Sequence, residues 1–492
     1  EEALGGPAAG APSPATPARA KGRRSVAVLP LVNLGDEDDD YLGQTLTEDL
    51  VDLLSVVPEL RVRPRGLTLP FSDPTRDVRE AGRALGVDVV GDGSVRRSGE
   101  AVRVAVRLVT VEDGFQLWAK RFERRPAQVL TVAEEAADAI ATVLTASPVP
   151  HARAAAADPV AQESYLRGRF LLNRGWYEIN RSAIVLLEDA YARAPDDPRI
   201  AGTYALALAR GAADQSLGAA AQRRARDASE HALTCDRTQP EARTALGVVH
   251  LAQNEGAAAA AELRRALALA PNAVSALDVA GRLLGEVGCV DEGLALLERA
   301  LAIEPGIMMC RHGIARALAL RGDWEGAEEA FGPPPPDPRD QPLYFLTRAR
   351  LALWRGDDGA VARVAEDFAA ANLPPGATRA VGGLLRVARE RRMPREDIDE
   401  MDETLPLDRS QSPRRSAFNA QARAEVLLAI GALDDAVAML RRADANALYD
   451  VAWMDGCPLL SPVRGRPEVA ALRDACALRA ARIAEAWREA AG

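Results

Sequence analysis

The sequence predicts an α+β protein that is mostly helical, in which a small α/β unit is followed by an all-α superhelix of repeated helix pairs. Two observations lead to this prediction. Residue types recur every 34 positions in the second half of the chain, and strand-like segments separated by glycine turns occupy the first quarter. At 492 residues the chain has room for about two to four domains.

The 34-residue recurrence is clearest between residues 241 and 331. The positions that match at this spacing are Gly247 and Gly281, Ala266 and Ala300, Pro271 and Pro305, and Gly288 and Gly322. Each unit holds two amphipathic helices and a turn, with small residues where the helices approach closely and a proline that ends the second helix. One such unit cannot bury its apolar stripe alone, so neighbours are expected to stack and to curve around a groove.

The first quarter of the chain alternates strand and helix patterns. The expected elements are a strand at 25–31, a helix at 42–57, a strand at 60–65, a helix at 78–85, strands at 87–97, 102–111 and 115–122, and a helix at 127–145. Gly99 and Gly114 suit hairpin turns between the last three strands. Valines alternate with arginines and alanine from Val102 to Arg107, which indicates a sheet with one covered face.

Several short segments in this unit resemble the TolB-like amino-terminal domain of bacterial signalling proteins. They are Ser25–Pro30, Asn33–Leu34, Leu46–Leu50, Gly93–Arg97 and Asp113–Trp118. The 34-residue units resemble the tetratricopeptide (TPR) repeat. The resemblance implies a TolB-like domain that precedes TPR repeats and is fused behind a catalytic or DNA-binding domain, most closely as in the carboxy-terminal half of bacterial serine/threonine protein kinases. Gln44–Thr45 departs from it, because the family has Asp-Gly there.

Changes in composition divide the chain into four expected segments. These are a disordered Pro/Ala/Gly linker at 1–24, the TolB-like α/β domain at 25–146, TPR repeats at 158–332, and degenerate TPR-like repeats with a capping helix at 341–492. The proline cluster at 332–338 cannot continue a helix and separates the last two. Because the chain opens inside a linker, we expect it to be part of a longer polypeptide.

Charge and cysteine usage limit the classes of partner. A net charge of −10 argues against binding to a phosphate backbone, so nucleic acid is not an expected partner. Five scattered cysteines without a CxxC pair indicate a reducing, cytoplasmic compartment, and Cys310 with His312 is too small a set for a metal site. No apolar run reaches about 18 residues, so no membrane segment is expected.

Catalytic motifs are missing from the sequence. It contains no GxxxxGK[ST] phosphate loop, no HRD or DFG kinase motif and no nucleophile elbow. Gly91 and Gly93 precede no helix, and Asp113-Gly114-Phe115 reads as a turn. The chain itself is therefore expected to be no enzyme, with no catalytic residue, cofactor or bound metal.

The candidate site is a polar stripe on the first helices of neighbouring repeats. Asp278 and His312 are 34 positions apart, and so are Arg282 and Arg316. A row of arginines with polar neighbours suits the carboxylate or the acidic side chains of a peptide, so these four residues are the predicted peptide-binding groove. The alternative is a solvated face on which Asp278 and Arg282 pair within one helix at i,i+4.

Two classes of function remain open. The first is a non-catalytic regulatory and protein-interaction module of a bacterial signalling protein, in the region carboxy-terminal to a serine/threonine kinase domain, with a protein or peptide in the TPR groove. The second is the sensor or effector half of a transcriptional regulator or nucleotide cyclase whose output domain lies elsewhere. The choice rests on the resemblance alone. The partner and the oligomeric state are left open.

Overall fold

The computed structural model describes residues 23–125, 128–145, 158–174, 181–213, 219–335, 341–371, 373, 375–392, 405, 407 and 412–490. The linker expected at 1–24 lies outside the described residues except for its last two positions. The connector at 146–157 and residues 336–338 of the proline break also lie outside them.

The first unit is a mixed sheet with helices on both faces. Its elements are β1 (Arg24–Val28), β2 (Val32–Asn33), a 3-10 turn (Glu37–Asp39), α1 (Asp40–Ser55), β3 (Leu60–Val62), α2 (Arg65–Thr68), a second 3-10 turn (Leu69–Phe71), α3 (Val78–Leu85), β4 (Val89–Ser98), β5 (Ala101–Thr110), β6 (Gln116–Arg124) and α4 (Val129–Thr145). The strand order is β3-β1-β4-β5-β6, and β2 pairs with β4. The strand expected at 60–65 is shorter, because Pro64 begins the turn into α2.

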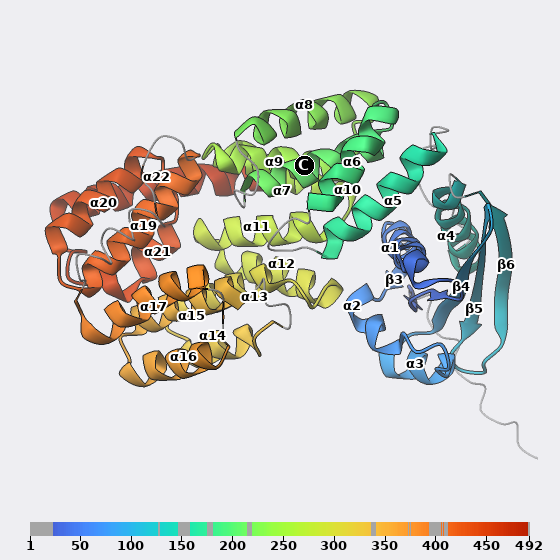
Figure 1. The fold of residues 1–492 in the computed structure, drawn as a ribbon, viewed down its shortest axis with the longest axis horizontal. Coiled ribbons are helices and arrows are strands. Elements are labelled where there is room, and N and C mark those ends of the chain that lie inside the picture. The colour runs from blue at the N-terminus through green and yellow to red at the C-terminus, as the bar shows by residue number, and fades with distance from the viewer. Residues whose placement is uncertain are drawn as a thin grey trace, which may run out of the picture.

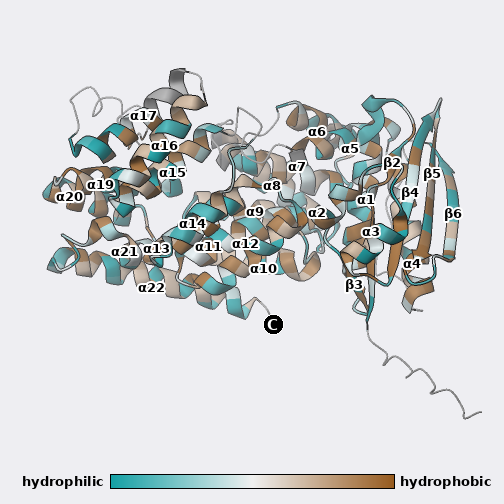
Figure 2. Cartoon of the chain, turned by 90° about the horizontal axis from the view of Figure 1, so that it is seen from below, coloured by the Kyte–Doolittle hydropathy of each residue, from teal (hydrophilic) through white to brown (hydrophobic). Residues whose placement is uncertain are grey.

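Parallel and antiparallel pairing meet at β4. Strands β1 and β3 pair in parallel, as do β1 and β4, whereas β4–β5 and β5–β6 are antiparallel hairpins. Gly99 and Gly114 have φ angles of 61° and 79° in the two hairpin turns, where glycine adopts the left-handed region without strain. In Figure 2 strand β5 is mainly brown, whereas the edge strand β6 carries teal stretches, in keeping with the covered and open positions of the two strands.

The described residues after α4 form helices and their connecting turns. The helices are α5 (Pro159–Arg174), α6 (Arg181–Arg193), α7 (Pro198–Ala213), α8 (Ala219–Cys235), α9 (Pro240–Ala252), α10 (Gly256–Leu269), α11 (Val274–Glu286), α12 (Val290–Ile303), α13 (Met308–Leu320), α14 (Trp324–Phe331), α15 (Gln341–Arg355), α16 (Asp358–Ala370), α17 (Pro375–Glu390), α19 (Pro413–Ala429), α20 (Leu433–Ala445), α21 (Val451–Gly456), a 3-10 turn (Pro458–Leu460) and α22 (Pro467–Glu489). Figure 1 shows the sheet at one end and the helix pairs stacked away from it.

The 34-residue period reappears in the helix boundaries. The first helices α9, α11 and α13 begin at residues 240, 274 and 308, and the second helices α10, α12 and α14 begin at 256, 290 and 324. A Cβ added at Gly281 would lie 2.7 Å from Leu297 Cγ and 2.9 Å from the Gly293 carbonyl oxygen, so the small residues do permit close packing. The predicted fold class, a small α/β unit followed by a superhelix of helix pairs, is confirmed.

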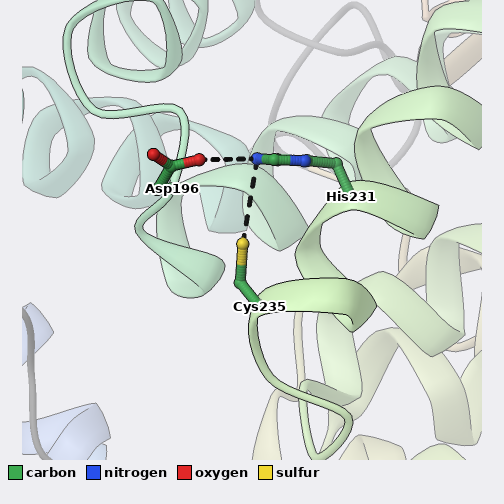
Figure 3. A group of neighbouring side chains, drawn as sticks. All are labelled: Asp196, His231 and Cys235. Carbon is green, nitrogen blue, oxygen red and sulfur yellow. Dashed lines mark hydrogen bonds and ion pairs between the residues drawn. The ribbon is translucent and has the colours of Figure 1, made fainter.

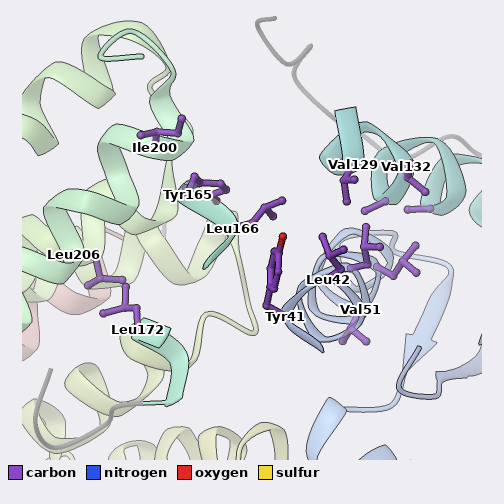
Figure 4. Close-up of a cluster of buried hydrophobic side chains, with 14 of the residues drawn as sticks. Tyr41, Leu42, Val51, Val129, Val132, Tyr165, Leu166, Leu172, Ile200 and Leu206 are labelled. Atoms are coloured by element: carbon purple, nitrogen blue, oxygen red, sulfur yellow. The ribbon is translucent and has the colours of Figure 1, made fainter. Parts of the chain in front are cut away.

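One apolar core joins the sheet unit to the first repeats. Leu42 and Val51 of α1 and Val129 and Val132 of α4 belong to the same buried cluster as Leu166 of α5, as Figure 4 shows. Polar contacts reinforce this junction: Arg97 pairs with Glu163 at 3.0 Å, and Arg65 of α2 pairs with Glu304 after α12 at 2.9 Å. The sheet unit is thus held against both the first and the fourth helix pair.

Candidate functional site

Asp278 and Arg282 pair with each other on α11. The Arg282 guanidinium donates through Nε to Asp278 Oδ1 at 3.0 Å and through Nη2 to Oδ2 at 2.7 Å. Burial lowers the pKa of this guanidinium, but the carboxylate outweighs burial and the net pKa is raised. This i,i+4 pair is the arrangement that the alternative interpretation of the stripe expects.

His312 lies inside the protein rather than on a solvated face. Its side chain is packed edge-on against Phe331, with ring centroids 5.5 Å apart, and its Nδ1 lies 3.2 Å from Thr347 Oγ1 of α15. Its Nε2 is buried without a hydrogen-bond partner. Burial, with a smaller contribution from Arg282, lowers the pKa of the imidazole to about 3, so His312 is neutral at physiological pH.

The alternative interpretation, a solvated face, is therefore wrong for two of the four residues. Asp278 and His312 are only 8% and 6% exposed. The Cys310 thiol also donates to Asp278 Oδ1 at 3.4 Å, which places this carboxylate among α11 and α13 side chains. The physical reason is that Phe331 of α14 and Thr347 of α15 pack against His312, a contact that the sequence period alone does not reveal. Whether the four residues bind a peptide stays a prediction.

Arg316 pairs with a carboxylate that is 134 residues further along the chain. Its guanidinium donates to Oδ2 of Asp450, which immediately precedes α21. Gln421 Nε2 also donates to Asp450 Oδ2 at 3.2 Å, and the backbone N–H of Trp453 donates to Oδ1 at 3.1 Å. Asp450 therefore joins α13, α19 and α21 through one side chain that is 5% exposed.

Arg350 on α15 continues the series, because it lies 34 positions after Arg316. Its guanidinium forms a bidentate pair with Glu425 of α19, with Nε to Oε2 and Nη2 to Oε1 both at 2.7 Å. The Glu425 side chain is 2% exposed. Burial lowers the pKa of Arg350, yet the pairing with Glu425 raises it above the usual value. We call Arg282, Arg316 and Arg350 the arginine ladder.

Arg350 was not among the predicted site residues, although the sequence contains a signal for it. The spacing is the same as between Arg282 and Arg316, but the proline cluster after Phe331 hides the repeat register. Asp450 and Glu425 carried no such signal, because Glu425 lies in α19 and Asp450 caps α21, and neither element follows the 34-residue period.

Residues 412–457, which we call the return segment, lie against the first helices of the repeats. Helix α19 contacts α9, and α21 contacts α11 and α13 (Figure 1). Arg414 Nη2, at the start of α19, donates to Glu286 Oε1 at 2.6 Å at the end of α11. The return segment thus supplies the acidic partners of two ladder arginines and an arginine for the acidic end of α11.

A hollow of about 650 Å³ lies on another side of α15. Its walls include Tyr344, Phe345, Arg348, Glu328 and Asp367. Arg348 donates through Nη1 to Asp367 Oδ2 at 2.7 Å and through Nη2 to Glu328. Arg348 and Arg350 are two positions apart on one helix, so they point roughly 200° away from each other and serve different faces.

Comparisons with known proteins give partial matches. No protein-family profile matches this sequence. A Rhizobium meliloti (strain 1021) protein whose name assigns it to the adenylate cyclases is 34% identical over 134 residues, which are 27% of this chain and 22% of that protein. The chain therefore matches less than a quarter of the length of this curated relative.

Solved structures resemble parts of the fold at low sequence identity. TolB from Acinetobacter baumannii is 15% identical and covers 25% of this chain and 29% of its own, with a TM-score of 0.20. MamA is 20% identical, covers 35% and 90%, and has a TM-score of 0.25. A human IFIT1 dimer with m7Gppp-AAAA is 15% identical, covers 72% and 77%, and has a TM-score of 0.32.

In the part of the chain that the structure describes, no helix combines the length and the apolar character needed to cross a membrane.

Proposed function

We propose that the chain is a non-catalytic regulatory and protein-interaction module of a bacterial signalling protein, and that its arginine ladder binds acidic side chains of a protein partner. The observation that carries this proposal is the contact between Arg316 and Asp450. Arg316, a ladder arginine predicted to bind acidic groups, is paired with the carboxylate of Asp450, which comes from a distant segment. Charge-assisted hydrogen bonds of this kind are directional and stronger than those between neutral groups.

In this proposal the return segment is the internal competitor of the partner. Asp450 and Glu425 neutralise Arg316 and Arg350 as long as the segment is in place. A partner with suitably spaced carboxylates gains access when the segment moves away. Arg282, which pairs within its own helix, is the ladder position that needs no such displacement, and its side chain is 34% exposed.

The test uses two substitutions with opposite expected effects on partner capture. Asp450→Asn keeps the side-chain acceptor for the Trp453 N–H but removes the charge that neutralises Arg316, so capture should rise. Arg316→Ala removes the binding group, so capture should fall. A charge-assisted hydrogen bond contributes about 1.5–3 kcal/mol, which corresponds to about tenfold or more in affinity.

The measurement is quantitative recovery of proteins from a lysate of the native host on immobilised chain. Arg473→Ala is the matched control, because Arg473 is a bidentate arginine outside the ladder with a side chain 42% exposed. Melting curves of each variant separate unfolding from loss of binding. Equal recovery by the wild type, Asp450→Asn and Arg316→Ala chains would overturn the proposal. A change of recovery in the same direction in both variants would also overturn it.

Two classes of longer protein are candidates to contain this chain. The residue patterns of the sheet unit support a position carboxy-terminal to a serine/threonine kinase domain. The 134-residue similarity to a protein named as an adenylate cyclase supports the alternative, the sensor or effector half of a nucleotide cyclase or transcriptional regulator. The gene sequence upstream of the codon for Glu1 tests both candidates. HRD and DFG motifs there would favour the kinase, a cyclase catalytic domain would favour the nucleotide cyclase, and a winged helix would favour the transcriptional regulator.

We also propose that residues 25–146 form a unit that folds alone, followed by repeats at 158–332 and 341–492. Limited proteolysis should then release the first unit by cleavage within 146–157. This is a stringent test, because α1 and α4 share an apolar core with α5 and the freed unit would expose that apolar surface. First cleavage within residues 87–122 would contradict the proposal.

The compartment is part of the proposal as well. All five cysteines are free thiols, which supports a reducing, cytoplasmic location.

A further inference from the structure

Three side chains that are common metal ligands converge at the outer side of the second helix pair. His231 and Cys235 are one turn apart on α8, so they share a face, and Asp196 lies in the turn between α6 and α7 (Figure 3). His231 Nε2 is 3.1 Å from Asp196 Oδ1 and 3.8 Å from Cys235 Sγ. The three ligand atoms all lie within 4.8 Å of one another.

These separations match those around a tetrahedral metal ion. Zinc binds at about 2.0–2.1 Å from nitrogen, 2.0–2.2 Å from oxygen and 2.3 Å from sulfur, so two ligands at the tetrahedral angle lie about 3.4 Å apart for nitrogen and oxygen and about 3.6 Å apart for nitrogen and sulfur. The two distances from His231 Nε2, 3.1 Å to Asp196 Oδ1 and 3.8 Å to Cys235 Sγ, differ from these by a few tenths of an ångström. All three ligand atoms lie within 4.8 Å of one another, which brings them within reach of one ion.

We propose that Asp196, His231 and Cys235 bind a divalent transition-metal ion of the zinc class, with a fourth position open to water or to a donor from another molecule. A thiolate, an imidazole and a carboxylate together suit zinc and not calcium or magnesium, which take oxygen ligands. The Asp196 side chain is 85% exposed and that of His231 is 38% exposed, so an ion can enter from solvent.

Binding exchanges protons for metal bonds. The Cys235 thiol loses its proton to solvent and becomes the thiolate ligand, and Asp196 binds through a carboxylate oxygen. The imidazole binds through Nε2, so its remaining proton lies on Nδ1. The overall change is one metal ion bound and one proton released, with no oxidation or reduction.

Such an ion would link two helix pairs. Asp196 follows α6, the second helix of the first pair, whereas His231 and Cys235 belong to the last turns of α8, the second helix of the next pair. The ion therefore fastens neighbouring pairs together, and it stabilises the folded state because only the folded chain brings the three ligands together.

A second histidine in the same chain provides a built-in comparison. His250 Nδ1 lies 2.6 Å from Glu255 Oε2, which makes a similar histidine–carboxylate contact. Among the described residues, one group of three or more histidine, cysteine or acidic side chains has its ligand atoms close enough together for a metal ion. That group is the one at α8, and His250 does not belong to it. A metal that binds at any surface histidine–carboxylate pair would not distinguish the two sites.

The test is a titration of the metal-free full chain with Co²⁺, followed by displacement with Zn²⁺. Wild-type protein should bind one Co²⁺ at this site, show a thiolate-to-cobalt charge-transfer band, and release one proton per ion. Cys235→Ser and His231→Ala should lose the band and bind at least about tenfold more weakly, since even loss of a group that only supports a ligand weakens metal binding about 10–100-fold. His250→Ala and Cys289→Ser should behave as the wild type.

Melting curves with and without Zn²⁺ provide a second measurement that does not depend on the cobalt charge-transfer band. The ion should raise the melting temperature of the wild type and of the two control variants, and should not raise that of Cys235→Ser or His231→Ala. The variants should fold, because His231 and Cys235 lie at the surface, and far-UV circular dichroism checks this. Absence of saturable binding in the wild type, or an unchanged band in Cys235→Ser and His231→Ala, would overturn the proposal.

Discussion

The helix pairs from α9 to α14 and the return segment are both α-helical, yet their contacts differ in kind. The pairs pack through small and aliphatic residues on neighbouring helices, with Gly281 and Gly293 in close contact across one pair. The return segment shares buried apolar clusters with the same repeats and also forms ion pairs with residues that are far apart in sequence, such as Arg316 with Asp450. Nearest-neighbour packing repeats with the period of the chain, whereas the long-range pairs occur once each.

This difference explains why one region was predictable and the other was not. A stacked repeat is stabilised mainly by contacts with the next repeat, so every unit needs the same small residues at the same positions. An ion pair between α15 and α19 needs one arginine and one carboxylate, and no other position in the chain has to match them. The comparison can be tested by breaking each kind of contact.

The largest effect is expected at the buried pair of Arg350 and Glu425. Glu425→Gln keeps the size of the side chain but leaves the Arg350 charge buried without its partner. Removal of one member of a buried ion pair costs about 3–5 kcal/mol, and the free energy of unfolding, measured in urea by circular dichroism, should fall by that amount. The double variant Arg350→Met with Glu425→Leu should recover much of the loss, because it buries no charge. A loss below 1 kcal/mol in Glu425→Gln would show that the return segment is held by other contacts.

A smaller effect is expected where the helices of one pair approach most closely. Gly281→Ala puts a methyl group within 3 Å of Leu297 and the Gly293 carbonyl, and overpacking of this kind costs about 1–3 kcal/mol. The control is Gly285→Ala on the same helix, where the added methyl group meets no atom within 4 Å. That control should stabilise the chain by about 0.5–1 kcal/mol, since alanine favours a helix over glycine. Similar unfolding midpoints for the two variants would contradict the packing argument.

His312 is buried against Phe331 of α14 and Thr347 of α15 and should make stability depend on pH. Its pKa is about 3 in the folded chain and near 6.5 when unfolded, so the unfolded state takes up the proton first as the pH falls. The stabilisation by neutral His312 is complete above pH 6.5 and is lost as the pH falls toward 3. Between pH 7 and pH 5.5 the loss is about 1 kcal/mol. His312→Leu should remove that part of the pH dependence, and an unchanged dependence in this variant would contradict the buried, neutral state.

Much of the fold followed from the sequence, and the reasons are local. The α3 helix has the ends that were predicted, and the structure gives the reason: Asp77 caps its start and Gly86 ends it in the left-handed region. Strand β2 was missed because two residues carry no alternation pattern. The positions of Arg282 and Arg316 were predictable from their spacing, and the pairing of Arg282 with Asp278 was the stated alternative. The pairing of Arg316 with Asp450 was not predictable, since a contact across 134 residues depends on how the whole superhelix closes.

The smallest effect is expected at Arg473 and Asp455, and it separates burial from geometry. This pair is bidentate, with Nε to Oδ1 and Nη2 to Oδ2 both at 2.8 Å, nearly the same as the 2.7 Å of Arg350 and Glu425. Its side chains are 42% and 50% exposed, against 16% and 2% for the buried pair.

If distance decided the energy, Arg473→Ala and Arg350→Ala would destabilise the chain equally. Solvent screening predicts otherwise: an exposed pair contributes about 1 kcal/mol or less, and 1 M salt should reduce that contribution further. Parallel urea unfolding of the two variants at low and high salt measures both. A loss in Arg473→Ala as large as that in Arg350→Ala would mean that the return segment is held by pair geometry, and that the burial of Glu425 by the repeats adds little.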